Sequence, residues 1–172
     1  KAADFWVKPY LELFRLIRHF GSLKFDELRL FGLQLTDYRN FDSIVAKIDQ
    51  FRIEKAQNQG NYKKFYRDYL QSELRQIFAD RIQSGETKTR ETKDASISTF
   101  LRTQASNLRD YADACVRYLR ATGLVNISHI GKSLSIAPEK TEEVDYFLLH
   151  TERDPIFIED EKLYIEYLGN AE

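Results

Sequence analysis

Apolar residues recur at spacings of three and four along most of this chain, which is the period of a helix with one buried face. The first such stretch runs from Pro9 to Phe20 and stops at Gly21, and a second begins with Ser22 as a capping residue and reaches about Leu30. Together they predict a helix-turn-helix-like pair. Two longer helices are expected next, from about Phe41 to Ala56 after the capping residues Thr36 and Asp37, and from about Tyr62 to Ile82 after the breaker sequence Asn58-Gln59-Gly60-Asn61.

The pattern stops in residues 84–94, which hold no apolar side chain and are rich in threonine and basic residues. Such a segment predicts a mobile loop and the clearest subdomain junction in the chain. A fifth helix follows, from about Ala95 to Thr122. Its buried stripe is expected to consist of Leu101, Ala105, Leu108, Ala112, Cys115 and Leu119.

The most informative stretch comes directly after this helix. Gly123 ends the helix, and the residues from Val125 to Pro138 alternate around a polar tip, which predicts a β-hairpin with its turn near Gly131. A long helix that passes directly into a two-stranded ribbon is typical of a winged-helix unit, and most winged helices bind DNA. A sixth helix, acidic in its first turn, is expected from Pro138 to about Leu149.

The predicted fold class is therefore mainly α with one short β-hairpin, as a helical bundle plus a winged-helix-like subdomain. We expect a helical subdomain over residues 1–84, a basic flexible loop over 85–94, a winged-helix-like subdomain over 95–150, and an acidic C-terminal segment over 151–172 that leads to a next domain. The 172 residues suffice for one full domain or for two small subdomains that share a core.

Composition narrows the class of protein. Hydrophobic residues make up 42% of the chain, and no apolar run approaches the roughly 20 residues of a membrane span. The start lacks the apolar core of a signal peptide, and the chain holds no methionine, which suggests an internal piece of a longer protein. A single cysteine, Cys115, excludes an internal disulfide framework and favours a reducing cytoplasm.

The net charge of −1 conceals an asymmetry. Residues 1–138 hold 23 Lys/Arg and 16 Asp/Glu, whereas residues 139–172 hold 3 Lys/Arg and 11 Asp/Glu, so the net charges are +7 and −8. A basic body beside an acidic segment is compatible with a module that binds a polyanion next to another domain. Two solvated faces without any partner explain the same charges equally well.

The exposed face of the fifth helix carries the main candidates for DNA contact. Arg102, Ser106, Arg109, Asp113 and Arg117 lie opposite the buried stripe, and the flanking positions hold Gln104, Asn107 and Arg120. These residue types read base edges or hold phosphates, and residues three to four apart on a helix in the major groove address successive bases. The alternative is a solvated face with internal ion pairs among Arg109, Asp110 and Asp113.

Two further basic groups would complete a DNA interface. Lys88, Arg90 and Lys93 lie in the polar loop, where a flexible basic arm can bind phosphate. His129 and Lys132 lie at the hairpin tip, where a wing would contact the backbone or the minor groove. An ordinary exposed loop explains the first group as well.

Catalytic and metal signals are weak. The three histidines, His19, His129 and His150, are isolated from any ligand at metal-binding spacing. Asp154, Asp160 and Lys162 faintly match the carboxylate and lysine pattern of magnesium-dependent nucleases, but no extended strand pattern surrounds them. An acidic turn is the simpler interpretation.

Residues 41–148 resemble the middle of the AlwI family of type IIS restriction and nicking endonucleases. The resemblance is carried by Ile48-Asp49-Gln50-Phe51-Arg52, residues 108–114, Arg117-Tyr118-Leu119-Arg120-Ala121-Thr122-Gly123-Leu124, and Leu134-Ser135-Ile136-Ala137-Pro138-Glu139-Lys140. Weaker similarity extends back to Pro9. The matches are strongest at packing positions, so the base-contacting residues above come from helix geometry and not from the resemblance.

The resemblance implies a part of the recognition half, which reads a short asymmetric site in double-stranded DNA. It also implies the cytoplasm of a prokaryotic cell as the location. Cleavage with Mg²⁺ would belong to a separate catalytic domain of the parent protein, so no cofactor is expected in this fragment. Two alternatives stay open. One is a protein-interaction module that never touches bases, for which the aromatic residues of the fourth helix would be suited, and the other is a self-sufficient nuclease that uses Asp154, Asp160 and Lys162.

Overall fold

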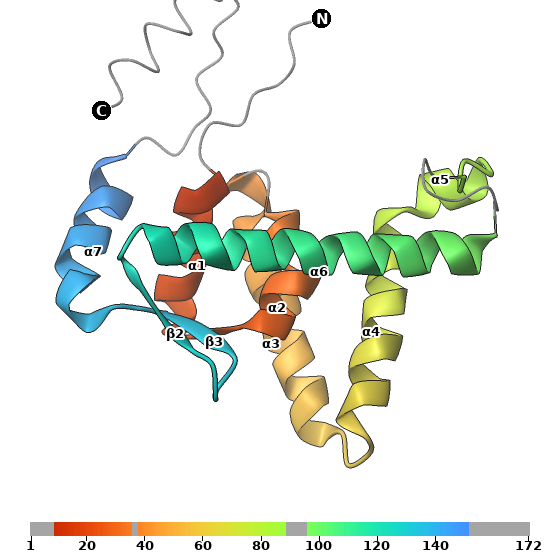
Figure 1. Ribbon diagram of the computed structural model, residues 1–172, viewed down its shortest axis with the longest axis horizontal. Coiled ribbons are helices and arrows are strands. Elements are labelled where there is room, and N and C mark those ends of the chain that lie inside the picture. The colour runs from red at the N-terminus through yellow and green to blue at the C-terminus, as the bar shows by residue number, and fades with distance from the viewer. Residues whose placement is uncertain (1–8, 36–37, 89–95, 152–172) are drawn as a thin grey trace, which may run out of the picture.

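One long helix, α6 (Ile97–Ala121), crosses the whole molecule in the computed structural model (Figure 1). The structure describes residues 9–35, 38–88 and 96–151. The other elements are α1 (Pro9–Phe20), β1 (Leu23–Lys24), α2 (Phe25–Leu30), α3 (Phe41–Gln57), α4 (Tyr62–Ile77), α5 (Ala79–Gln83), β2 (Val125–Ser128), β3 (Ser133–Ile136) and α7 (Thr141–His150), with 3-10 turns η1 (Gly32–Gln34), η2 (Tyr38–Asn40) and η3 (Pro138–Lys140). The predicted fold class, mainly α with a short β element, is confirmed.

The α6 helix is bounded by local sequence signals at both ends. The hydroxyl of Ser96 accepts a hydrogen bond from the amide of Thr99 (3.3 Å), which caps the first turn. Gly123 adopts φ +69°, a left-handed conformation that disfavours other residues, and directs the chain from the helix into β2. Neither α6 nor any other helix in the described part of the chain is long and apolar enough to cross a membrane.

The predicted hairpin is present, but it belongs to a three-stranded antiparallel sheet with the order β1-β3-β2. In β2 and β3, Val125 lies opposite Ile136 and Ser128 opposite Ser133. The third strand, β1, corrects our expectation of a helix that begins at Ser22, because Leu23 pairs with Leu134 and the helix starts only at Phe25. A strand of two residues has no period of its own, so its partner strand decides its conformation.

One smaller difference concerns the fourth predicted helix. The fourth predicted helix is divided at Phe78 into α4 and α5, although the apolar spacing continues through the break. The caps Thr36 and Asp37, most of the polar loop, and the acidic segment after Thr151 lie outside the described residues.

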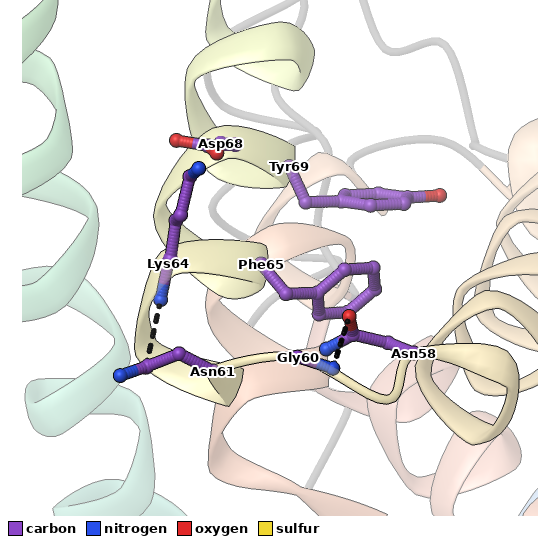
Figure 2. A pocket seen from close by; sticks show the side chains of 7 residues that line it. All are labelled: Asn58, Gly60, Asn61, Lys64, Phe65, Asp68 and Tyr69. Atoms are coloured by element: carbon purple, nitrogen blue, oxygen red, sulfur yellow. Dashed lines mark hydrogen bonds between the residues drawn. The ribbon is translucent and has the colours of Figure 1, made fainter.

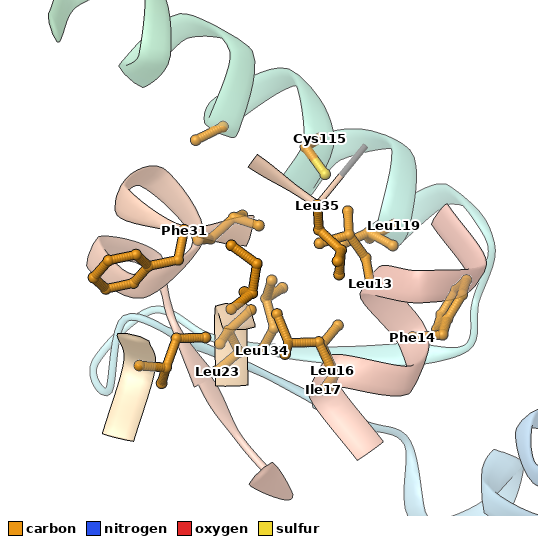
Figure 3. Packing of buried hydrophobic residues seen from close by; sticks show 14 of the residues in the cluster. Leu13, Phe14, Leu16, Ile17, Leu23, Phe31, Leu35, Cys115, Leu119 and Leu134 are labelled. Atoms are coloured by element: carbon orange, nitrogen blue, oxygen red, sulfur yellow. The ribbon is translucent and has the colours of Figure 1, made fainter. Parts of the chain in front are cut away.

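The main core lies between the C-terminal half of α6 and the elements below it (Figure 3). Its fully buried side chains come from α1, β1, α2, α3, α6 and β3, and include Leu16, Ile17, Leu23, Leu28, Phe51, Leu119 and Leu134. Residues from both sides of the predicted 85–94 boundary therefore share one core. A second, smaller cluster of Leu74, Phe100 and Leu101 fastens the N-terminal half of α6 to α4.

The helices α3, α4 and α5 lie in the sequence between two halves of one structural unit. The α3–α4 pair leaves the main core as an antiparallel hairpin, whose tip lies away from α6 (Figure 1). Before it come α1, β1 and α2, and after it come α6, β2 and β3, which complete the sheet and the main core. The unit is thus continuous in space but interrupted in sequence.

Candidate nucleic-acid interface

One exposed side of α6, which borders the buried face, carries a row of charged side chains. Arg102, Arg109, Asp113 and Arg120 are seven, four and seven residues apart, a spacing that aligns them along the helix, and all four are exposed. We call these four residues the α6 stripe. Leu101, Ala112, Cys115 and Leu119 lie about 100° around the helix from the stripe and are all buried as the sequence predicted, whereas Ala105 and Leu108 are half-buried.

The arginines of this face are only weakly engaged within the protein. Arg109 Nε lies 3.5 Å from Asp110 Oδ1, and Arg109 Nη2 donates to Ser106 Oγ at 3.2 Å. Exposed pairs of this kind contribute about 0.2–1 kcal/mol. Within the part of the chain that the structure describes, Arg102, Arg117 and Arg120 make no ion pair. The guanidinium groups are therefore available to an outside partner.

Asp113 is held differently from Asp110, the other acidic residue on the exposed part of α6. Its Oδ1 lies 3.4 Å from Nη2 of Arg29, which comes from α2. Arg29 Nη1 lies 3.8 Å from Asp26, and the hydroxyl of Tyr62 donates to Asp26 Oδ2 at 2.6 Å. A polar chain thus connects α4 through α2 to the exposed face of α6.

The tyrosines at the buried end of this polar chain remain protonated at physiological pH. Burial and the hydrogen bond to Asp26 raise the pKa of Tyr62 well above its ordinary value. Burial, followed by the nearby charge of Asp26, raises the pKa of Tyr66 to about 12. Tyr62 therefore stays a hydrogen-bond donor to Asp26.

The β2–β3 hairpin, which we call the wing, is held at its tip (Ser128–Lys132) by hydrogen bonds to the start of α2. The amide of Phe25 donates to the carbonyl of Lys132 at 2.9 Å, and Nζ of Lys24 donates to the carbonyl of Gly131 at 3.0 Å. The amide of Gly131 donates to Ser128 Oγ at 2.8 Å, which closes the turn. The side chains of His129, Ile130 and Lys132 remain exposed.

A buried carboxylate fixes α2 beneath the wing. Glu27 is 2% exposed and accepts hydrogen bonds from the amide of Lys24 (2.8 Å) and from Nε and Nη2 of Arg52 (2.7 and 2.9 Å). The guanidinium of Arg52 also lies over the ring of Phe20, 4.4 Å from its centroid. This contact was not predicted from the sequence, although a glutamate at the third position after the N-cap is a known capping signal.

The structure brings some predicted site residues together and separates others. Arg109, Arg117 and Arg120 lie on the half of α6 that packs against α2 and precedes the wing, which carries His129 and Lys132. Arg102 lies on the half that packs on α4. Gln104 and Asn107 are half-buried and lie on the flank of α6 away from the stripe.

The described end of the basic loop and the wing adjoin different ends of α6. Lys88 is exposed and ends the described segment that follows α5, which lies near the N-terminus of α6, whereas the wing follows the C-terminus of α6 (Figure 1). A helix of 25 residues is about 37 Å long, so the two ends are separated by roughly one turn of DNA. Arg90 and Lys93 lie outside the described residues.

An open pocket of about 440 Å³ lies at the tip of the α3–α4 hairpin (Figure 2). Phe65 and Tyr69 form its apolar wall. Asn58 Oδ1 accepts from the amide of Gly60 (3.2 Å), and Asn61 Oδ1 accepts from the amides of Lys63 and Lys64 (2.9 and 3.3 Å). These amide oxygens build the turn and the cap of α4, so they explain the shape of the pocket without a ligand.

The described residues offer no site that fits a catalytic metal. In residues 9–35, 38–88 and 96–151, no three His, Cys, Asp or Glu side chains come close enough together to hold an ion. Asp154, Asp160 and Lys162 lie outside these ranges. Cys115 is buried, and this burial raises the pKa of its thiol to about 11, which is unfavourable for a nucleophile.

Comparison with known proteins assigns the chain to a family. A family model described as AlwI restriction endonuclease matches residues 2–170. A search of curated proteins finds no match. The family match includes every element from α1 to α7, and it extends beyond residues 41–148, which carry the sequence resemblance. The chain therefore belongs to the AlwI restriction endonuclease family.

Proposed function

We propose that this chain is the DNA-recognition part of a type IIS restriction endonuclease, which reads double-stranded DNA and does not cut it. The observation that carries the proposal is the assembly of α2, the C-terminal half of α6 and the wing into one unit through Phe25–Lys132, Lys24–Gly131 and Arg29–Asp113. The order helix, strand, helix, helix, hairpin, with the sheet order β1-β3-β2, is that of a winged helix. In this proposal α3–α5 are an insertion into the winged helix.

In this arrangement the C-terminal half of α6 enters the major groove. Arg109 and Arg117 are exposed there, and an arginine that donates to O6 and N7 of guanine is the commonest specific contact of this kind. Lys132 and His129 would touch the backbone beside the groove. Lys88, Arg90 and Lys93 would bind phosphates about one turn away, and Arg102, Gln104, Asn107 and Arg120 would lie at the margins of the contact.

Cleavage belongs, in this proposal, to a separate catalytic domain of the parent protein, which would carry the Mg²⁺. Support comes from the family, which is one of endonucleases. No catalytic step is assigned to the residues of this chain.

Binding to a random-sequence duplex library across a salt series tests the proposal. We expect retention that falls steeply with salt, because Lys and Arg contacts release counterions, and enrichment of one short asymmetric motif. Retention without enrichment would reduce the role to phosphate binding. Absence of retention at low salt would refute the proposal.

A plasmid assay tests the absence of catalysis. We expect no cleavage when the chain is incubated with supercoiled plasmid and Mg²⁺. Cleavage that Asp160→Ala abolishes would instead identify a self-sufficient nuclease.

A protein-interaction module is the second candidate, and one observation favours it. Tyr111 and Tyr118 are 64% and 63% exposed on the flank of α6 away from the stripe, and Tyr118 makes an edge contact with Tyr10 of α1 at 6.2 Å. Exposed aromatic side chains are common in protein interfaces. The aromatic residues of α4, by contrast, pack against the core: Phe65, Tyr66 and Tyr69 are partly buried there. Salt-insensitive association with a protein, without duplex binding, would select this function.

A further inference from the structure

We infer that Asp113 reads a base that carries an exocyclic amino group, cytosine through N4 or adenine through N6, and that Arg29 positions Asp113 for this contact. The inference rests on the proposed function and adds to it the class of base pair that one residue selects. Asp113 is negatively charged, so it weakens any purely electrostatic attraction to DNA. Its position among exposed arginines therefore suggests a more specific role.

Asp113 lies in the middle of the α6 stripe. Arg109 comes one turn before it and Arg117 one turn after it. The neighbouring arginines would contact the DNA on either side of Asp113, and its carboxylate could then accept hydrogen bonds from the amino donors of bases in the groove.

The carboxylate has one oxygen held and one oxygen available. Oδ1 lies 3.4 Å from Nη2 of Arg29, and within the described part of the chain Oδ2 accepts no hydrogen bond. The side chain is 53% exposed, so a partner can reach it. Arg29 belongs to α2 and is itself held by Asp26, which means that the orientation of Asp113 is set from outside its own helix.

Asp110 provides the internal comparison. It lies on the same exposed face three residues earlier, but off the line of the stripe. Its ion pair is to its sequence neighbour Arg109 at 3.5 Å, and both side chains are more than half exposed. No residue of another element holds it in the described structure, so it neutralises Arg109 without being oriented.

The chemistry of a carboxylate makes the assignment selective. An ionised carboxylate only accepts hydrogen bonds. In the major groove cytosine and adenine present amino donors, whereas guanine O6 and thymine O4 are acceptors that would repel it. Asp113 would therefore favour C or A at one position of the site and disfavour G or T there.

Selection from the random duplex library with three proteins tests this: the unmodified chain, Asp113→Ala, and Asp110→Ala as the matched control. Both substitutions remove one negative charge from the same exposed face, so both are expected to raise binding to random DNA equally. Only Asp113→Ala is expected to lose the preference for C or A at one position while the rest of the motif persists. Circular dichroism checks that both variants keep their helix content.

A base analogue separates a direct contact from a rearrangement. The C or A at that position is replaced by an analogue without the amino group. We expect the unmodified chain to lose about tenfold in affinity, and Asp113→Ala to bind both duplexes alike. Arg29→Ala should weaken the preference at this position and at no other.

An unchanged motif in Asp113→Ala, or the same change of motif in Asp110→Ala, would overturn the inference while the proposed function stands. If the unmodified chain enriches no motif at all, the proposed function fails and the inference fails with it.

Discussion

Arginine side chains on an exposed helix can exchange a weak internal pair for a stronger bidentate one, and Arg109 is in this position. Its contacts with Asp110 and Ser106 are exposed and of ordinary length. Replacing it with alanine therefore costs little stability. The effect of the substitution should fall on binding.

We predict that Arg109→Ala weakens binding to the cognate duplex by about 1–3 kcal/mol. The reason is the loss of a bidentate contact to a base, and fluorescence anisotropy with cognate and random duplexes measures it. Arg75→Ala removes another exposed arginine, from α4 and outside the proposed interface, and should change binding little. An equal loss on random DNA would instead assign Arg109 to a backbone contact.

Glu27 gives a prediction about stability at the same scale. Glu27→Ala leaves the Lys24 amide without its acceptor and Arg52 without its carboxylate, so we expect a loss of about 2–3 kcal/mol in the free energy of unfolding. Arg52 is one-third exposed and can regain water, which keeps the loss below that of a fully buried pair. Urea denaturation measures it. Glu142→Ala changes an exposed glutamate in the first turn of α7 and should cost less than about 0.5 kcal/mol; equal effects would mean that Glu27 contributes nothing special.

The α6 helix packs against two separate hydrophobic clusters. Its C-terminal half belongs to the main core, whereas its N-terminal half rests on Leu74, Phe100 and Leu101. Phe100 is fully buried and makes an edge contact with Phe78 at 5.3 Å. The two halves can therefore differ in stability.

We predict that Phe100→Ala loosens the N-terminal half of α6 first. Removing a buried ring costs about 3–5 kcal/mol where the site cannot collapse, and here the loss is concentrated in the smaller cluster. Hydrogen exchange should speed up for the amides of residues 97–108 and much less for residues 112–121. Ile97→Ala, at a 38% exposed position of the same helix, serves as control. Uniform loss of protection along the helix would show that the two cores form one cooperative unit.

How far the fold could be predicted depended on the kind of element. The helices have a period that the sequence displays, and the bounds of α1 and α6 agree with the predicted ones within two residues. β1 has two residues and a partner about 110 positions away, so its conformation depends on a contact that no local pattern contains. The exposed side of α6 was also predictable from the period. The Arg29–Asp113 contact, between residues 84 positions apart, was not.

At the scale of the whole molecule, several buried groups resist losing a proton. Burial raises the pKa of Cys115 to about 11 and that of Tyr66 to about 12, above their ordinary values of 9.0 and 10.0. Above pH 9 the unfolded chain therefore loses protons that the folded protein retains. The contribution of these groups to the free energy of unfolding is fully present below pH 9, and it is lost as the pH rises towards 11–12.

We predict that the free energy of unfolding falls by about 2 kcal/mol between pH 8 and pH 10.5, as measured by urea denaturation. Cys115→Ala should reduce the fall, because it removes the group with the lowest of these pKa values. A stability that is flat over this range, or an unchanged slope in Cys115→Ala, would contradict the assignment of the loss to these buried groups.

The position of α3–α5 between the two halves of this unit also has a consequence during translation. Lys24 and Gly131, which join at the wing, are separated by 107 residues. At about 5–20 residues per second, a ribosome needs roughly 5–20 s to synthesise the stretch between them. During that interval α1 and α2 have emerged, but α6 and β3, which cover their apolar faces, have not. The nascent chain thus exposes Leu16, Ile17, Leu23 and Leu28 for many seconds, which makes this segment a natural binding site for a chaperone at the ribosomal exit.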